Sequence, residues 1–227
     1  GLQIQLNNYL IDPLPFRAYE WAREYRDRLT RDPSLRLAYD IETPGKGEDE
    51  GDLGEEDDPT YFIHRIGFSD GAHRALTVPW TPEFMPAIRL CMESSGEKVV
   101  WNAGFDNPRI RHNGVGIGGV VHDGMVAWHV LHSDLPKGLA FVATFTCPWQ
   151  PAWKHLSHAS PGFYNCTDAD VEYRSMAVIE AELKRVGLWD VYLADVVEME
   201  PILTHMSEKG MPIDGELRLH RAVQLAE

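Results

Sequence analysis

Four acidic residues stand in three short motifs that are spread along the chain: Asp40 with Glu42, then Asp106, then Asp168. Carboxylates that converge on one point repel one another and raise one another's pKa unless cations neutralise them. Hard divalent cations such as Mg²⁺ take oxygen ligands of this kind. Two such ions about 3.5–4 Å apart stabilise the attacking and the leaving oxygen in phosphodiester hydrolysis. The four acids therefore predict an enzyme that cuts phosphodiester bonds.

The spacing inside the first and third motifs favours side chains that share a face. Asp40 and Glu42 are two residues apart, and residues two apart on a strand point to the same side. Tyr164 and Asp168 are four apart, so on a helix they lie on one face. A phenol with a pKa of about 10 would position an attacking water rather than deprotonate it. The alternative for Tyr164 is a half-buried packing residue.

The second motif has two interpretations for its amide. Asn102 and Asp106 are four apart and share a helical face if the helix begins near Asn102. Asn102 can instead cap that helix by accepting a hydrogen bond from its first turn. Two further acids, Asp170 and Glu172, lie close to the third motif, and we expect them to be solvated or structural.

Apolar runs and turn residues predict the elements that must position these motifs. Strands are expected at 35–41, 61–69, 74–80, 98–101 and near 120–121, with Asp70-Gly71 as the turn between the second and third. Helices are expected at 82–95, 105–112, 123–132, 139–145, 161–186 and 195–209, and from Asp214 to the end. Three strands followed by strands that alternate with helices predict an α/β protein, a mixed sheet flanked by helices.

The charge is uneven along the 227 residues, whose formal net charge is −14. Residues 46–58 hold eight acids and one Lys, a composition typical of a solvated loop, and we interpret it as a mobile insertion with no catalytic role. The global charge argues against a broad basic platform for DNA. It leaves room for a small active site that holds a few nucleotides.

Composition also excludes several classes of protein. The chain contains no apolar run of about 18 residues, so we expect no membrane span, and its first residues lack the regions of a signal peptide. Cys91, Cys147 and Cys166 are few and widely spaced, which predicts reduced thiols in a cytosolic setting. His155 and His158 fit no standard zinc pattern, so a structural or surface role is expected.

Taken in order, the three motifs resemble those of a known superfamily. They are Asp-x-Glu-Thr at 40–43, Asn-x-x-Phe-Asp at 102–106 and Tyr-x-x-x-Asp-Ala at 164–169. They resemble the exonuclease motifs of the Tyr-containing branch of the DEDD superfamily. The segment 200–214 resembles the part of family-A DNA polymerases where the exonuclease domain joins the thumb, and Tyr-Asn-Cys-x-Asp at 164–168 looks like the phage-type enzymes. The resemblance extends from residue 35 to the end of the chain.

This resemblance implies a ribonuclease H-like fold with a helical C-terminal extension. The implied division is an N-terminal segment at 1–34, an exonuclease domain at 35–187 and a thumb-like extension at 188–227. The implied activity is 3′–5′ removal of nucleotides from single-stranded DNA 3′ ends, as in proofreading. A polymerase domain in cis or in trans is the implied partner, and the cytoplasm of a bacterium or of a phage-infected host is the implied location. The insertion at 46–58 and the absence of polymerase palm and fingers depart from the pattern.

The resemblance also assigns roles to the acids. Asp40 is expected to bridge two Mg²⁺ or Mn²⁺ ions, Glu42 and Asp168 to complete the site of the first ion, and Asp106 to hold the second. Tyr164 and Glu42 would position the water. Substrate contacts are implied for three further residues, Thr43, Asn102 and Phe105.

Two other functions remain open at this stage. One is a ribonuclease D-like RNA exonuclease, against which the thumb-like tail argues. The other is a non-catalytic nucleic-acid-binding module, against which the complete set of acids and Tyr164 argues. Trp149, Trp153 and Lys154 lie in an interhelical loop, where the aromatic residues either stack on bases or pack as core or lid; packing is the favoured interpretation.

Overall fold

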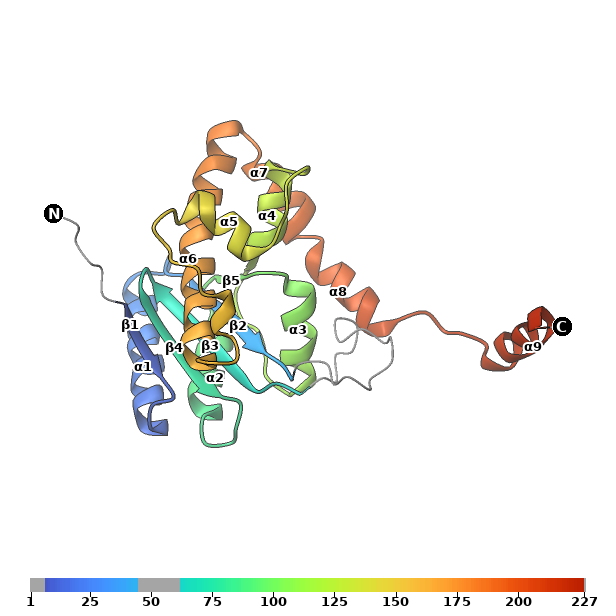
Figure 1. The fold of residues 1–227 in the computed structure, drawn as a ribbon, viewed down its shortest axis with the longest axis horizontal. Coiled ribbons are helices and arrows are strands. Elements are labelled where there is room, and N and C mark those ends of the chain that lie inside the picture. Colours follow the sequence, from blue (N-terminus) through green and yellow to red (C-terminus); the bar gives the residue numbers. More distant parts are fainter. Residues whose placement is uncertain (1–6, 45–61, 227) are drawn as a thin grey trace.

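A six-stranded mixed sheet forms the centre of the computed structural model, which describes residues 7–44 and 62–226 (Figure 1). The strand order is β1-β4-β3-β2-β5-β6. The strands are β1 (Asn8–Ile11), β2 (Leu37–Glu42), β3 (Arg65–Gly71), β4 (Arg74–Pro79), β5 (Lys98–Val100) and β6 (Val121–Asp123). β3 is antiparallel to β2 and β4, while the other neighbouring pairs are parallel. The predicted mixed sheet is confirmed, and the acidic segment 46–58 lies outside the described residues.

Helices cover both faces of this sheet. They are α1 (Pro15–Arg31), α2 (Met85–Met92), α3 (Ala103–His112), α4 (Gly124–Leu131), α5 (Leu139–Thr146), α6 (Pro161–Val186), α7 (Trp189–Tyr192), α8 (Glu200–Lys209) and α9 (Gly215–Ala226). A 3₁₀ turn at Lys154–Leu156 precedes α6, and a π-helical segment at Leu193–Val197 precedes α8. Figure 1 shows α9 apart from the sheet at the end of an extended segment. None of the described helices is both long and apolar enough to cross a bilayer.

The alternation of β2 decides which helices face the acidic residues. Leu37, Tyr39 and Ile41 are buried in a core with α1 and α2, whereas Ala38 is buried in a second core with α4 and α6. Successive strand residues point to opposite faces, so Asp40 and Glu42 follow Ala38 to the side of α6. The polar end of β2 is therefore directed at a helix that carries the third motif.

α6 lies very close to the sheet at one glycine. Gly67 on β3 is the ladder partner of Asp40, and a Cβ atom built on Gly67 would lie 2.7 Å from Asn165 Oδ1 and 2.8 Å from the Asn165 carbonyl oxygen. A side chain at residue 67 would thus overlap the backbone of α6. The glycine lets the helix axis approach the strand that pairs with β2.

The limits of α6 agree with the sequence prediction of a helix at 161–186. Pro161 occupies the first turn, where its missing N–H is no loss. Gly187 ends the helix with a φ of +77° and donates its N–H to carbonyl groups of the last turn, a conformation in which glycine carries no steric penalty. The same physical signals that define the ends of the helix fix where Asp168 sits along it.

The N-terminal 34 residues, for which no element was predicted, contain β1 and α1. β1 is an edge strand parallel to β4, and α1 contributes Ala18, Trp21 and Tyr25 to the core that includes α2. These residues belong to the same sheet and core as the motifs. The division of the chain at residue 35 stays a prediction.

Two predicted features differ from the structure. The Asp70-Gly71 turn is wrong, because β3 continues to Gly71 and the turn falls at residues 72–73. Asp70 is buried and bound by Arg28 and Arg74, so it belongs to the packed ladder. The single helix predicted at 195–209 is divided into a π-helical segment and α8, which begins anew with a proline in its first turn.

Candidate active site

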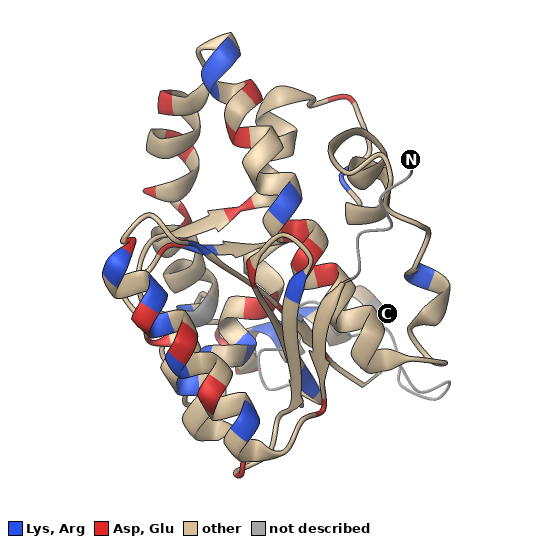
Figure 2. Ribbon diagram, turned by 90° about the vertical axis from the view of Figure 1, so that its left-hand side faces the viewer, with Lys and Arg blue, Asp and Glu red and all other residues tan. Residues whose placement is uncertain are grey.

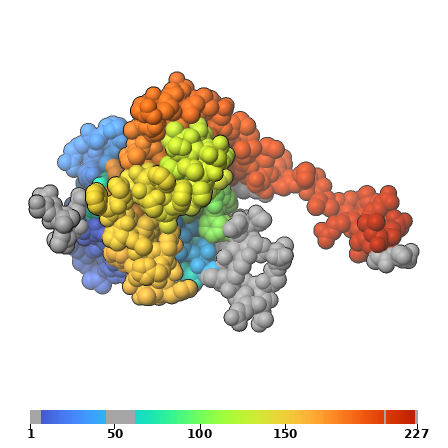
Figure 3. Space-filling model, turned by 45° about the horizontal axis from the view of Figure 1, so that its top comes forward, coloured from blue at the N-terminus to red at the C-terminus, as the bar shows by residue number. Residues whose placement is uncertain are grey.

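Three carboxylates meet where the end of β2 faces α6. Asp40 and Glu42 come from the strand and Asp168 from the helix, and one carboxylate oxygen of each lies within 4.8 Å of the others. In Figure 3 the gold atoms of the first half of α6, the green atoms of α3 and a group of blue atoms adjoin one another on one face of the molecule. The strand pair and the helix acid that the sequence assigned to one site are therefore brought together.

Asp40 is fixed by a residue that sequence reasoning missed. The Asn165 amide Nδ2 donates to the Asp40 carbonyl oxygen at 3.1 Å and to Asp40 Oδ2 at 2.7 Å. Asn165 Oδ1 in turn accepts from the Thr77 hydroxyl at 2.6 Å. A polar residue beside Tyr164, on a helix expected to pack on the sheet, was the available signal. Asn165 ties the first motif to the third.

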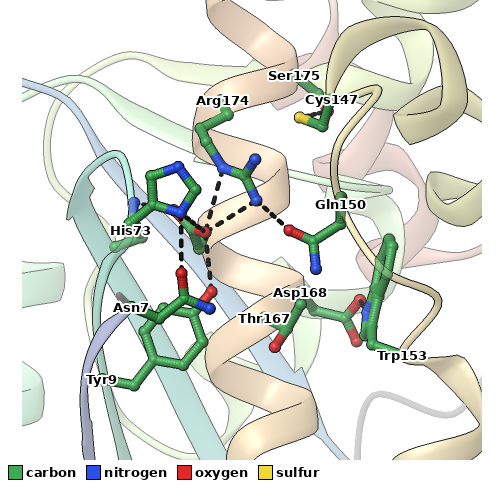
Figure 4. Close-up of polar contacts among 12 residues, drawn as sticks. Asn7, Tyr9, His73, Cys147, Gln150, Trp153, Thr167, Asp168, Arg174 and Ser175 are labelled. Atoms are coloured by element: carbon green, nitrogen blue, oxygen red, sulfur yellow. Dashed lines mark hydrogen bonds and ion pairs between the residues drawn. The ribbon is translucent and has the colours of Figure 1, made fainter. Parts of the chain in front are cut away.

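Asp168 is held from the other side by the loop before α6. Trp153 Nε1 donates to Asp168 Oδ1 at 2.8 Å, and Lys154 Nζ donates to the same oxygen at 2.7 Å. Lys154 Nζ also donates to the Tyr164 hydroxyl at 3.0 Å. Figure 4 shows the Trp153 ring against the Asp168 carboxylate. Tyr164 and Asp168 share one face of the helix, as their spacing predicted.

Asp106 approaches β2 from α3 without joining the three-carboxylate group. Asp106 Oδ1 accepts from the Ile41 backbone N–H at 3.1 Å, between the two β2 acids. The buried Asp106 side chain is thus directed at the strand backbone. The fourth acid thus lies beside the strand that carries Asp40 and Glu42, and its carboxylate accepts from a backbone donor.

Asn102 stands at the N-cap of α3, yet its side chain makes no capping hydrogen bond. It has a φ of +77°. The N–H groups of Asn102 and Ala103 instead bind the Asp123 carboxylate, at 3.2 and 2.8 Å. Asp123 also caps α4 through Met125 and Val126. The capping role considered for the Asn102 amide is performed by an acid on β6, and the Asn102 side chain is half-buried.

The remaining predicted substrate contacts are partly exposed. Thr43 follows β2 directly and is half-buried. Phe105 is also half-buried, and the Arg109 guanidinium carbon lies 3.8 Å from the centre of its ring. Trp149, by contrast, is 91% exposed, while Trp153 is 3% exposed. The packing interpretation is confirmed for Trp153 and fails for Trp149.

Two acids that we expected to be solvated or structural are buried. Asp170 accepts from the Tyr9 hydroxyl and the His73 backbone N–H and pairs with Arg174. Glu172 lies one turn beyond Asp168, and its Oε2 has no hydrogen-bond partner among the described residues. Asp170 is structural, as anticipated, but neither acid is solvated, because α6 is buried around most of its circumference at these residues.

Burial and neighbouring carboxylates raise the pKa values of several acids in and around the site. Burial and the nearby Asp168 carboxylate together raise the pKa of Glu42 to about 7, against the opposing effect of Lys154. Burial, together with neighbouring carboxylates, also raises the pKa of Asp40 and of Asp106 well above the usual range. The pKa of Glu172 shifts in the same direction for the same reasons. Four carboxyl groups that resist ionisation together form a site that favours a cation.

In the described part of the chain, basic residues are interspersed with acidic ones. Figure 2 shows Lys and Arg alternating with acidic residues along α1, and red acidic residues gathered on the ribbon near the centre of the view. Electrostatic attraction of a nucleic acid over a long range is thus weak in the described part of the chain.

The donor set fits a hard divalent cation. Asp40, Glu42 and Asp168 offer oxygen atoms from carboxylates, the ligands that Mg²⁺ and Mn²⁺ prefer. A bound cation would offset the repulsion that raises the pKa values of Asp40 and Glu42. Among the described residues, His155 and His158 take no part in this group. Cys91, Cys147 and Cys166 are buried free thiols.

The raised pKa of Glu42 gives a stability prediction with a definite sign. The folded protein binds the Glu42 proton more tightly than the unfolded chain does. The resulting contribution to the stability of the wild type is fully present below the ordinary pKa of 4.5, and it is lost as the pH rises through about 7. The metal-free melting temperature of Glu42→Gln minus that of the wild type should therefore grow between about pH 5 and about pH 8. Thermal unfolding in EDTA measures it, and Mg²⁺ should shrink the difference. A difference that is constant or falls with pH would contradict the assignment.

Several solved structures with a similar fold are structures of nucleases. The polymerase domain of Pol1 from M. smegmatis, in complex with DNA primer-template and dNTP, matches with a TM-score of 0.64 and 11% identity, over 88% of this chain and 31% of that one. Brucella melitensis NrnC with bound Mg²⁺ matches with a TM-score of 0.62 and 18% identity, over 93% and 99%. The chain has a ribonuclease H-like exonuclease fold.

Escherichia coli RNase D, an exoribonuclease involved in structured RNA processing, matches with a TM-score of 0.61 and 11% identity, over 91% of this chain and 52% of that one. No protein-family model and no curated protein matches the sequence. The identities are low, so these similarities establish the fold alone. The chain spans 31% of the Pol1 chain and nearly all of NrnC.

Proposed function

We propose that this chain is a metal-dependent 3′–5′ exonuclease that removes nucleotides from single-stranded DNA 3′ ends, as a proofreading domain does. The observation that supports it most strongly is the convergence of Asp40, Glu42 and Asp168 within 4.8 Å, with Asp106 bound to the backbone between the two β2 acids. In this proposal a polymerase domain, in cis or in trans, supplies the DNA end.

The acids would hold two divalent cations. Asp40, Glu42 and Asp168 would hold the first, and Asp106 together with Asp40 the second. Bound cations of this kind lower the pKa of a water molecule and stabilise the leaving 3′ oxygen. The protein's part is to orient the reactants. Asn165 fixes Asp40 and Trp153 fixes Asp168, and Thr43, Asn102 and Phe105 would contact the terminal nucleotides.

The Tyr164 hydroxyl would align the attacking water. It accepts a hydrogen bond from Lys154 Nζ, so its own O–H is left to donate. Burial and the neighbouring Asp168 carboxylate raise the pKa of Tyr164 above its usual value. The phenol therefore stays protonated at neutral pH. A protonated phenol orients a water molecule without removing its proton.

DNA is favoured over RNA as substrate by the C-terminal extension. The exposed apolar residues of α9, Leu217, Leu219, Val223 and Leu225, suit a helix that is covered in a larger assembly, in keeping with the resemblance of 200–214 to a polymerase junction. The RNA alternative has support of its own, because the chain spans 99% of NrnC, a protein solved with bound pGG. The convergence of Asp40, Glu42 and Asp168 argues against the non-catalytic alternative.

The test compares matched DNA and RNA oligonucleotides labelled at the 5′ end, with Mg²⁺, Mn²⁺ or EDTA. We expect a ladder that shortens from the 3′ end on DNA and faster than on RNA, and no products in EDTA. Faster degradation of RNA would favour the ribonuclease alternative. Metal binding without turnover on either substrate would favour a binding module and overturn the proposed activity.

Tyr164→Phe should lower the single-turnover rate by about 10- to 100-fold and leave metal affinity unchanged. The variant loses only a hydroxyl that is assigned to water, and none of the three clustered carboxylates changes. Rapid-quench kinetics at saturating Mn²⁺ gives the rate, and isothermal titration calorimetry gives the affinity. Tyr173→Phe, on the same helix, is the matched control. A clear loss of Mn²⁺ affinity would show that Tyr164 supports the ligands instead.

A further inference from the structure

Lys154 is the basic residue that enters the acidic site. Its Nζ lies 2.7 Å from Asp168 Oδ1 and 3.0 Å from the Tyr164 hydroxyl, and 4.8 Å from the centre of the Tyr164 ring. Its side chain remains 41% exposed although Asp168 is buried. A residue placed in this way reaches the site from the solvent side and contacts both functional groups of the third motif.

The neighbouring tryptophan can orient Asp168 without help from Lys154. Trp153 is buried and donates Nε1–H to the same Asp168 Oδ1 atom that accepts from Lys154. Both donors therefore use one oxygen, and the second oxygen of the carboxylate is left for a metal ion. The neutral indole suffices to orient the carboxylate. The separate contribution of Lys154 is its charge and its hydrogen bond to Tyr164.

We propose that Lys154 is a positioning residue of the nuclease site, which offsets the charge of the clustered carboxylates and fixes the Tyr164 hydroxyl that aligns water. The inference rests on the proposed function. An ammonium group carries three N–H donors, and two are used here, by Asp168 and Tyr164. Because Tyr164 accepts from Lys154, its own proton is directed elsewhere, toward the oxygen of a water or of the substrate.

These two roles have opposite consequences for metal binding and for turnover. Removing the ammonium group makes the site more negative, so a divalent cation should bind more tightly. It also frees the Tyr164 hydroxyl to rotate, so water is aligned less well and turnover should fall. A residue that merely supported the fold would lower both quantities together. The sign of the change in affinity therefore distinguishes a positioning role from a structural one.

The experiment measures Mn²⁺ binding by calorimetry on the DNA-free 227-residue chain and single-turnover hydrolysis of a DNA oligonucleotide. Lys154→Met should bind Mn²⁺ about three- to tenfold more tightly, a modest change because the ammonium is partly exposed. It should also hydrolyse DNA about tenfold or more slowly. Its melting temperature in EDTA should fall, since the carboxylates lose a counter-ion.

Three further variants serve as controls. Lys184→Met changes the net charge equally on the helix that carries Asp168, where Lys184 pairs with Glu180 at the surface, and should leave affinity and rate unchanged. Trp153→Phe removes the neutral donor to Asp168 Oδ1 and should weaken Mn²⁺ binding. Lys154→Arg keeps the charge and should restore near wild-type affinity with part of the rate.

The outcomes are distinct. Tighter binding with slower hydrolysis in Lys154→Met supports the inference. Weaker binding with slower hydrolysis assigns Lys154 a structural role and overturns it, as does a variant in which neither quantity changes. If the wild-type chain binds Mn²⁺ but hydrolyses no oligonucleotide, the proposed nuclease function fails. The shift in affinity then still decides whether Lys154 offsets the charge of the site.

Discussion

Replacing Asp40 by alanine should lower the single-turnover rate of nucleotide release by at least about 10³-fold. Asp40 is the only residue in the proposal that contacts both cations, and its carboxylate lies with those of Glu42 and Asp168 within 4.8 Å. Asp168→Ala should have an effect of similar size, because it removes the ligand that α6 contributes. Hydrolysis of a 5′-labelled DNA oligonucleotide at saturating Mg²⁺ measures both.

The fold of Asp40→Ala should survive the substitution. The Asn165 amide keeps the Asp40 carbonyl oxygen as an acceptor, and removing one of several clustered carboxylates relieves repulsion. The melting temperature in EDTA should therefore equal or exceed that of the wild type near pH 8. Asp190→Ala, which removes an exposed acid at α7, is the control. Activity of Asp40→Ala within a few-fold of the wild type would refute the metal-site assignment.

Asp170→Ala should destabilise the protein by about 3–5 kcal/mol. Asp170 is fully buried and accepts from the Tyr9 hydroxyl at 2.8 Å and from the His73 backbone N–H at 2.6 Å. Its carboxylate also lies 3.0 Å from Arg174 Nη2. Figure 4 shows the side chains of Tyr9, His73 and Arg174 converging from β1, from the turn before β4 and from α6. Alanine would leave the guanidinium without its buried counter-charge.

Urea unfolding in EDTA gives the free energy for this variant. The double variant Asp170→Ala/Arg174→Met should be less destabilised than Asp170→Ala alone, because the orphaned charge is removed as well. Asp170→Asn, which keeps the shape but not the charge, should lie between the wild type and alanine. A loss below about 1 kcal/mol for Asp170→Ala would mean that the network is not a buried ion pair of consequence.

Local pattern was sufficient to predict the elements that carry the motifs. The end of α6 at Gly187 and the cap of α9 at Asp214 are signals that act within one turn, and both are confirmed. The alternation of β2 likewise placed Asp40 and Glu42 on one face. Each of these predictions depends on residues that are neighbours in the sequence.

What the sequence could not predict depends on contacts between distant segments. Burial of Asp170 has no local signal, because its partners Tyr9 and His73 are 161 and 97 residues away. The position of β1 at the edge of the sheet follows from a pairing with β4 that no local signal encodes. The turn of Asp106 toward the Ile41 N–H is of the same kind. The sequence motifs identified the candidate acids. Tertiary packing determines where each of their carboxylates points.

Gly67 gives the site its width. It is the ladder partner of Asp40, and the backbone of α6 occupies the space where its side chain would stand. Even a methyl group there would push the helix outward and carry Asp168 away from the β2 acids. Gly67 bears no functional group, yet it determines how far the Asp168 carboxylate on α6 lies from the carboxylates on β2. A glycine thus sets the distance between strand and helix at the proposed metal site.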